Sequence, residues 1–483
     1  MNLLTSIKNN KVVIYLVTRY ITFGLQFVVY LLLANKLGPY YMGIWGYFLL
    51  LNGYFSVINL GMPNSITISL VHNKEDERQS LNYEKSSFAV VGAICLLIVV
   101  FAVVCGLSNN NVLHKEELGS LFYVACIVGI LTQYTLIFTS IARVKGHLMS
   151  IAFSLTITVV LMLLAVMFFS GEKLLHFLGG AFLIGNVLSI VVYVGRKNIS
   201  FKGSVSREAI RVLIGQGLFL FIYNLCFQFI HISTRTLVGN NYEVEQFGFF
   251  SFAYTVAHSV ILLLEAVAAL IFPKVVDKFS SKKPDVVKKT IEDLRVVYIS
   301  TTHLLMYFAI SLIPLLLIFM PKYQQSLQCV NFMALTLLLY TNSYGYNTYL
   351  MSNHKEKLIA RNAAIVLLIN ISLGLLLIKA VGVSYQYVLV PTMLSYFVYS
   401  VLCVFYGNKL LGIKPPLLKL LGEIFHIRIV IPFICAIIVS VINDVRLSLL
   451  PLFLFILLNI PVLKDIIKHA IVMIKNPRIT DVK

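Results

Sequence analysis

The chain has few charged residues and very few acidic ones. Of its 483 residues, 12% are Asp, Glu, Lys or Arg, and only 20 carry a carboxylate side chain. Soluble proteins average about 25% charged and about 45–50% apolar residues. Here the hydrophobic share is 59% and the mean hydropathy is +0.88. This composition excludes a soluble globular protein and predicts an integral membrane protein.

The motifs of many enzymes and of ATP-driven pumps are also missing. No G-x-x-x-x-G-K-[ST] loop is present to hold ATP phosphates, and no Ser/His/Asp set or carboxylate pair stands out. The seven cysteines form no C-x-x-C pair, and the ten histidines show no metal-ligand spacing. We therefore expect no enzyme, no catalytic residues, no cofactor and no metal site.

The net charge of +19 is distributed as in a membrane protein, and so we expect no nucleic-acid partner. Fourteen apolar stretches alternate with polar loops, at about 12–34, 44–71, 87–107, 119–142, 148–170, 175–194, 212–238, 247–272, 297–320, 327–350, 362–380, 384–406, 429–443 and 447–463. With a cytoplasmic N-terminus, the great majority of the 39 Lys and Arg residues fall in cytoplasmic loops. The pattern predicts an all-α membrane protein with about fourteen spans and both ends inside. The opening segment, MNLLTSIKNNK, has no features of a cleaved signal peptide.

A polar stretch divides the chain into two halves of six spans each. It reads RKNISFKGSVSREAIR, from Arg196 to Arg211. We predict an N-lobe at 1–194, a cytoplasmic linker at 195–211, a C-lobe at 212–406, and a basic connector with two spans and a cytoplasmic tail at 407–483. A shift of 205 residues hints at duplication, since it superposes Gly43 on Gly248, Arg19 on Asn224, Gln26 on His231 and Tyr30 on Arg235.

Two spans carry polar stripes at helical spacing. The seventh span has a stripe that steps by four, three and four residues through Asn224, Gln228, His231 and Arg235. The first span has a similar stripe, formed by Tyr15, Arg19, Thr22, Gln26 and Tyr30. Such spacing places the side chains on one helix face, and polar groups in hydrocarbon favour a bundle interior or a water-filled cavity. We expect a transport path lined by these residues; the alternative is that the amides only join helices together.

The eighth span carries ionisable residues along one face, namely Tyr254, His258 and Glu265. Glu265 lies roughly 10 Å from the cytoplasmic end at about 1.5 Å per residue, a depth similar to that of Arg19. We hypothesise that Arg19 and Glu265 pair as an inner gate; equally, each can face water or its own lobe. Glu265 and His258 are also candidates for proton coupling, against the alternative that they are hydrogen-bonded packing residues.

Two turn segments carry a family resemblance, together with the Arg-bearing first span. One is the turn Leu37-Gly38-Pro39-Tyr40-Tyr41-Met42-Gly43-Ile44, and the other is Asn59-Leu60-Gly61-Met62-Pro63-Asn64, which also predicts a broken second span. With the six-plus-six-plus-two layout, the chain resembles the polysaccharide transporters of the multidrug/oligosaccharidyl-lipid/polysaccharide exporter superfamily. Within it, the resemblance is to O-antigen and capsule repeat-unit flippases.

The resemblance implies a two-lobed bundle that works by alternating access in the bacterial plasma (inner) membrane. The implied substrate is an undecaprenyl-pyrophosphate-linked oligosaccharide, moved from the cytoplasmic to the outer leaflet for surface polysaccharide assembly. We expect a monomer that meets this substrate, membrane lipids, and a polymerase or other pathway proteins. Arg19 and Arg235 suit phosphates, and sugars suit the aromatic and amide groups of Tyr15, Gln26, Tyr30, Asn224, Gln228 and His231.

Three other readings stay open. One is export of lipid II, whose transporters also have fourteen spans but tend to hold more arginines in the cavity than the two found in these stripes. A cation-coupled multidrug exporter of the same superfamily would place an acidic residue in the first lobe, where this chain has Arg19. A membrane-embedded enzyme acting on lipid-linked sugars would use acidic residues of the outer loops, for which Glu116, Glu117, Glu243 and Glu245 are the candidates.

Overall fold

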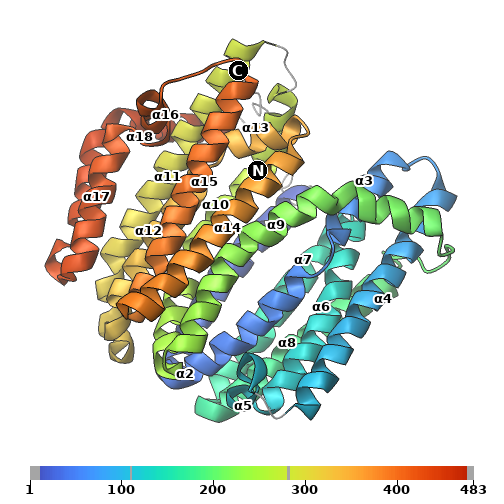
Figure 1. The fold of residues 1–483 in the computed structure, drawn as a ribbon. Coiled ribbons are helices and arrows are strands. Elements are labelled where there is room, and N and C mark those ends of the chain that lie inside the picture. The colour runs from blue at the N-terminus through green and yellow to red at the C-terminus, as the bar shows by residue number, and fades with distance from the viewer. Residues whose placement is uncertain (1–10, 109–110, 280–282, 476–483) are drawn as a thin grey trace. The chain divides into compact units, whose positions relative to one another are not determined.

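The structure is a computed structural model that describes residues 11–108, 111–279 and 283–475. Within these ranges the chain is built from helices and contains no strand (Figure 1). Its contacts divide it into two compact units, Met1–Ser251 and Phe252–Lys483. The predicted all-α membrane fold is confirmed.

The first unit is a bundle in which long helices pack side by side (Figure 1). Its helices are α2 (Lys11–Val57), α3 (Met62–His72), α4 (Glu77–Leu107), η1 (Val112–His114), α5 (Lys115–Leu118), α6 (Ser120–Val144), α7 (Leu148–Phe168), α8 (Gly171–Gly195) and α9 (Arg207–Asn241). The helices α2, α6, α7 and α8 pack on one another, and α9 packs against α2, α3 and α4. Helix α10 (Val244–Phe279) begins in this unit and continues into the second.

Glycine and proline interrupt the helices where the sequence predicts breaks. Within α2, Gly38 has φ 73° and ψ 171°, so the helix is broken there just before Pro39. The second break lies between the end of α2 at Val57 and the start of α3 at Met62. There Gly61 adopts a left-handed conformation with φ 72°, which glycine tolerates without a Cβ clash. The predicted broken second span is confirmed.

The beginning of α10 crosses α2 at very close range. A Cβ built on Gly43 would overlap the carbonyl of Val244, and one built on Gly248 would overlap the carbonyl of Pro39. Only residues without side chains allow two helix backbones to approach this closely. Gly43 and Gly248 are also the pair that the 205-residue shift superposes.

The predicted linker, 195–211, lies against the first unit. The carboxylate of Glu84 pairs with Lys145 Nζ at 2.5 Å and accepts a hydrogen bond from the Ser200 amide at 3.1 Å. The backbone amides of Ser204 and Ser206 are bound by the side chains of Asn82 and Ser86. The division into lobes at this linker remains a prediction.

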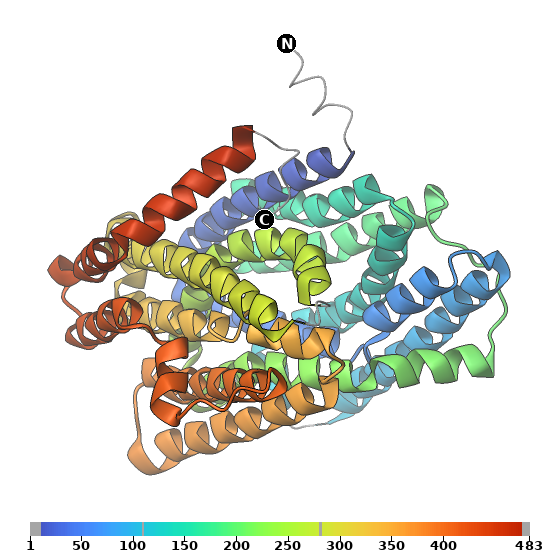
Figure 2. The same cartoon turned by 90° about the horizontal axis from the view of Figure 1, so that it is seen from above.

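The second unit contains the remaining helices. They are α11 (Pro284–Phe319), η2 (Pro321–Ser326), α12 (Leu327–Thr341), α13 (Tyr346–Ser352), α14 (Glu356–Leu376), η3 (Leu377–Val381), η4 (Tyr385–Val388), α15 (Leu389–Leu410), α16 (Leu417–Ile424), α17 (Ile427–Ile442), η5 (Val445–Leu447) and α18 (Leu450–Lys475). Helices α14 and α15 lie side by side in both views (Figures 1 and 2), and α18 packs on α11 and α17. Helix α16 meets α17 at 71°.

All fourteen predicted apolar stretches coincide with helices. Among the described residues, 9 helices are long and apolar enough to cross a membrane, or up to 11 if each bent pair is one span. One of these, Val17–His72, contains the second predicted stretch and most of the first. A count of fourteen is compatible with these helices, and the count and the topology remain predictions.

Candidate functional site: the polar faces of α2 and α9

Arg19 is the charged residue at the centre of the α2 stripe. It is half-buried, its Nη1 donates a hydrogen bond to the Tyr15 hydroxyl at 2.9 Å, and its guanidinium lies 5.3 Å from the centre of the Phe23 ring. No carboxylate of the described residues lies within 4.0 Å of it, and its Nε is buried without a hydrogen-bond partner. Within the part of the chain that the structure describes, the cluster is therefore cationic and has no acidic partner.

The other members of the α2 stripe do not behave alike. The Thr22 hydroxyl shares a 2.7 Å hydrogen bond with the Thr156 hydroxyl on α7, and the Thr22 side chain is buried. Thr22 therefore packs helix on helix. Gln26 and Tyr30 are half-buried like Arg19 and keep part of their surface accessible. The stripe brings two predicted site residues, Tyr15 and Arg19, into direct contact.

The α9 stripe changes character along its length. Gln228 is exposed, Asn224 and His231 are half-buried, and Arg235 has only 8% of its surface exposed. Arg235 Nη2 donates a hydrogen bond to the Gly46 carbonyl on α2 at 3.1 Å. At this end of the stripe the arginine is held in the bundle and does not extend its charge into water.

Further contacts between α2, η1 and the end of α9 surround Arg235. The Tyr47 hydroxyl donates to the Gly239 carbonyl at 3.1 Å, and Tyr54 is hydrogen-bonded to Thr236. The His114 ring stacks on Tyr47 with centroids 3.7 Å apart and is bonded to Asn240 Oδ1 at 2.8 Å. The remaining cavity there is about 10 Å³, too small for a ligand. These residues form a closed polar cluster, which we name the α2–α9 clasp: Tyr47, Tyr54, His114, Thr236, Gly239 and Asn240.

Burial lowers the pKa of His114 below its usual value of 6.5. The nearby Glu117 carboxylate and the hydrogen bond to Asn240 act in the opposite direction, with smaller effect. The stacked, neutral imidazole is therefore the form that the clasp favours near neutral pH.

The structure gives less information on the predicted gate. Glu265 belongs to α10, and its side chain lies outside the described residues, so its pairing with Arg19 remains a prediction. His258 is half-buried, and its ring stacks on Tyr254 with centroids 5.2 Å apart. Its role in proton coupling likewise remains a prediction. No three His, Cys, Asp or Glu residues of the described ranges are grouped so that they could hold a metal ion.

Comparison with known proteins identifies the family. The model of a family described as polysaccharide biosynthesis protein matches residues 9–279, more than half of the chain. The chain belongs to this family. No curated protein matches the sequence significantly.

Several solved structures of transporters are similar in fold. The lipid II flippase MurJ, in an inward closed conformation, is 14% identical, with 95% of this chain and 100% of that chain covered and a TM-score of 0.67. An inward-facing multidrug resistance MATE family transporter of the MOP superfamily is 10% identical, with 82% and 98% covered and a TM-score of 0.62. The eukaryotic MATE transporter AtDTX14 is 13% identical, with 85% and 99% covered and a TM-score of 0.53. At these identities the likeness concerns the fold alone.

Proposed function

We propose that this protein is a flippase that moves undecaprenyl-pyrophosphate-linked oligosaccharide repeat units from the cytoplasmic to the outer leaflet of a bacterial plasma membrane. Membership of the polysaccharide biosynthesis family supports a role in the assembly of a surface polysaccharide such as O-antigen or capsule. The fold shared with a lipid II flippase supports movement of a lipid-linked substrate, since lipid II is named as the cargo of that protein.

The observation that carries the proposal is the state of Arg19. A guanidinium within a membrane span is costly, and such a residue usually marks a path or a partner. The neighbours of Arg19 are a phenol and an aromatic ring, and no carboxylate of the described chain neutralises it. A pyrophosphate would supply the missing negative charge through charge-assisted hydrogen bonds. An exporter of cationic drugs would need the opposite charge at this position.

Transport by alternating access gives the α2–α9 clasp a role. In the predicted division, α2 belongs to the N-lobe and α9 to the C-lobe, so the clasp joins helices of different lobes. We assign it to the closed outer side of the transport path. Outward opening then requires the Tyr54–Thr236 and His114–Asn240 contacts to break, and closure restores them.

The experiment is a deletion in the native host, followed by analysis of surface polysaccharide and of lipid-linked sugars. The proposal expects surface polymer to disappear while complete repeat units accumulate in the cytoplasmic leaflet. Complementation with Arg19→Ala should fail, whereas Arg19→Lys should restore part of the polymer, because a point charge replaces the planar guanidinium. Arg78→Ala, which removes an exposed arginine of the same unit, is the matched control and should complement fully.

Other outcomes would replace the proposal. Truncated repeat units would indicate an enzyme of the pathway. Normal polymer with increased sensitivity to cationic dyes would indicate a multidrug exporter.

A further inference from the structure

A second polar region lies wholly within the second unit and away from both predicted stripes in the sequence. It surrounds a cavity of about 620 Å³ formed by α11, α13 and the bend between α16 and α17. One part of the lining is charged and includes Glu292, Asp293, Arg295 and Arg428. Another part is aliphatic and includes Val296, Ile299, Ile427 and Ile429. The lining therefore offers both charged and aliphatic contacts, which suit an amphiphilic ligand.

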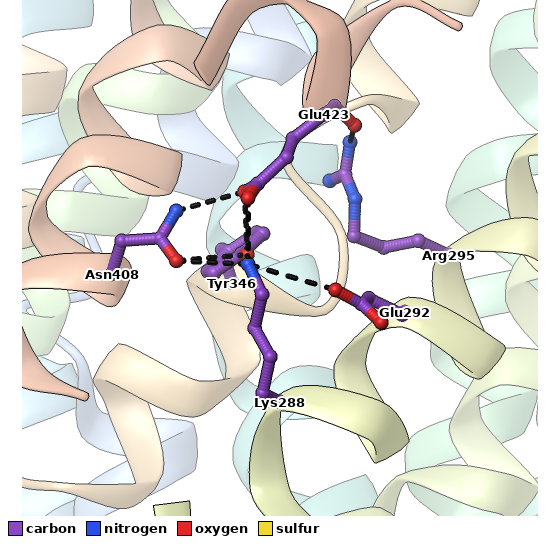
Figure 3. A network of polar contacts seen from close by, with 6 residues as sticks. All are labelled: Lys288, Glu292, Arg295, Tyr346, Asn408 and Glu423. Carbon is purple, nitrogen blue, oxygen red and sulfur yellow. Dashed lines mark hydrogen bonds and ion pairs between the residues drawn. The ribbon is translucent and has the colours of Figure 1, made fainter. Parts of the chain in front are cut away.

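One wall is held rigid by a network around Lys288 (Figure 3). Lys288 Nζ donates to the Tyr346 hydroxyl at 2.7 Å, to Asn408 Oδ1 at 2.9 Å and to Glu423 Oε1 at 2.8 Å. Asn408 Nδ2 and the Tyr346 hydroxyl donate to Glu423 Oε2 at 2.8 and 3.0 Å. The Glu423 carboxylate is thus fully engaged, and its charge is balanced by Lys288.

Arg295 lines this cavity and forms no ion pair with a carboxylate of the described residues. Its side chain is buried, and three of its N–H groups donate hydrogen bonds to the backbone carbonyls of Asn342, Tyr344 and Glu423 at 2.5, 3.1 and 3.3 Å. The guanidinium lies 5.4 Å from the centre of the Tyr346 ring. These neutral carbonyls fix its position while leaving the positive charge uncompensated.

Arg428 adds a second uncompensated guanidinium across the bend. Its Nε is buried without a hydrogen-bond partner, and none of the ion pairs among the described residues includes it. His426 also lines the cavity: burial lowers its pKa, the charges of Arg428 and Arg295 lower it further, and those of Glu292 and Glu423 act in the opposite direction with smaller effect. Arg295 and Arg428 therefore make this part of the lining basic.

Besides Glu423, the lining contains two acidic residues on its exposed side. Glu292 and Asp293 are exposed, and Glu292 approaches Lys288 only to 3.8 Å. Along α11 the lining changes from acidic at 292–293 to basic at 295 and aliphatic at 296 and 299, over about 10 Å at 1.5 Å per residue. The same order of ammonium, phosphate and acyl chain occurs in a zwitterionic phospholipid, read from water toward the bilayer.

We propose that this cavity binds the headgroup of a zwitterionic phospholipid, with the phosphate at Arg295 and Arg428, the ammonium at Glu292 and Asp293, and the chains along the aliphatic lining. The lining belongs wholly to the second unit, and the proposal stands or falls independently of the flippase assignment. An anionic lipid without an ammonium group would leave the two carboxylates facing its own negative charge. A lipid pyrophosphate would meet the same repulsion.

The test is native mass spectrometry of the purified full chain in detergent, with phosphatidylethanolamine or phosphatidylglycerol added at equal concentrations. The proposal expects preferential binding of phosphatidylethanolamine. Arg428→Gln should weaken this binding about tenfold, the usual value of a charge-assisted contact, and Arg428→Lys should weaken it less. The double variant Glu292→Gln/Asp293→Asn should abolish the preference while phosphatidylglycerol binding is kept or increased.

Arg446→Gln is the matched control, because Arg446 is exposed on η5 and outside the cavity lining, and it should bind like the parent. The proposal is overturned if phosphatidylglycerol binds as well as phosphatidylethanolamine to the parent protein. It is equally overturned if Arg428→Gln keeps full binding, or if the carboxylate double variant keeps the preference. Arg428→Lys keeps the positive charge. Its retained binding shows that the loss in Arg428→Gln comes from the missing charge and not from misfolding.

Discussion

Arg235 on α9 donates a hydrogen bond to the Gly46 carbonyl on α2 at 3.1 Å, whereas Arg19 donates to a phenol one helical turn away on its own helix. The two arginines of the predicted path therefore differ in what their removal leaves behind. Loss of Arg235 removes a buried hydrogen bond that joins α9 to α2. Loss of Arg19 leaves a tyrosine hydroxyl on a half-buried face.

We predict that Arg235→Met destabilises the protein by about 2 kcal/mol, the range for a hydrogen bond made by a charged group. Arg19→Met should change stability by less than about 0.5 kcal/mol and abolish transport. The measurement is the midpoint of thermal unfolding in detergent, followed by the fluorescence of Trp45, the single tryptophan, which is fully buried. Equal midpoints for the two variants would contradict the structural assignment of Arg235.

His114 makes the clasp sensitive to pH. Because its pKa in the folded protein is below 6.5, the unfolded chain binds more protons at mildly acidic pH. The stability contributed by His114 is complete above about pH 6.5 and is lost as the pH falls toward its folded pKa. We predict that the thermal unfolding midpoint falls as the pH is lowered from 7 to 5. His114→Gln should reduce the slope of this midpoint against pH.

His354→Gln is the control for that experiment, because the His354 side chain is 93% exposed. It should leave the slope unchanged. A slope that is the same in all three proteins would show that protonation of His114 is not coupled to folding.

Much of the fold is predictable from the sequence because bilayer spans depend on local composition. The helices at the fourteen apolar stretches and the break near Gly61 follow from hydropathy and from the backbone limits of glycine and proline. The Tyr15–Arg19 contact is predictable too, since it joins residues one turn apart. The burial of Thr22 is not predictable in this way: helical spacing places it near Arg19, but packing against α7 buries it.

The unpredicted polar clusters join residues that lie far apart in the chain. His114 of η1 is hydrogen-bonded to Asn240 of α9. Lys288 of α11 is hydrogen-bonded to Glu423, which lies in the segment predicted as a basic connector. Spacing along one helix contains no information on such pairs. In the same way Glu84 lies in a mixed-charge stretch with no local sign that it is buried, yet Lys145 and the linker amide enclose it.

The clasp can be tested by a reversible cross-link. We predict that a short bismethanethiosulfonate reagent links Tyr54→Cys to Thr236→Cys, because the length of the tyrosine side chain that hydrogen-bonds Thr236 separates the two positions by more than a direct disulfide spans. If the clasp must open in each cycle, this cross-link will stop delivery of surface polymer and a reductant will restore it. The single-cysteine variants are the controls. Undiminished polymer in the cross-linked protein would show that the clasp stays closed throughout transport.

The crossing of α2 and α10 provides the sharpest packing test. Gly248→Ala would place a Cβ inside the Pro39 carbonyl, and backbone cannot move aside as the end of a flexible side chain can. We predict a loss of about 2–3 kcal/mol, within the range for overpacked sites. Gly24→Ala is the matched control on α2, because nothing lies within 4 Å of its added methyl group and alanine favours a helix by about 0.5–1 kcal/mol over glycine. The two variants should therefore shift the unfolding midpoint in opposite directions, and a harmless Gly248→Ala would mean that the two backbones are not in contact there.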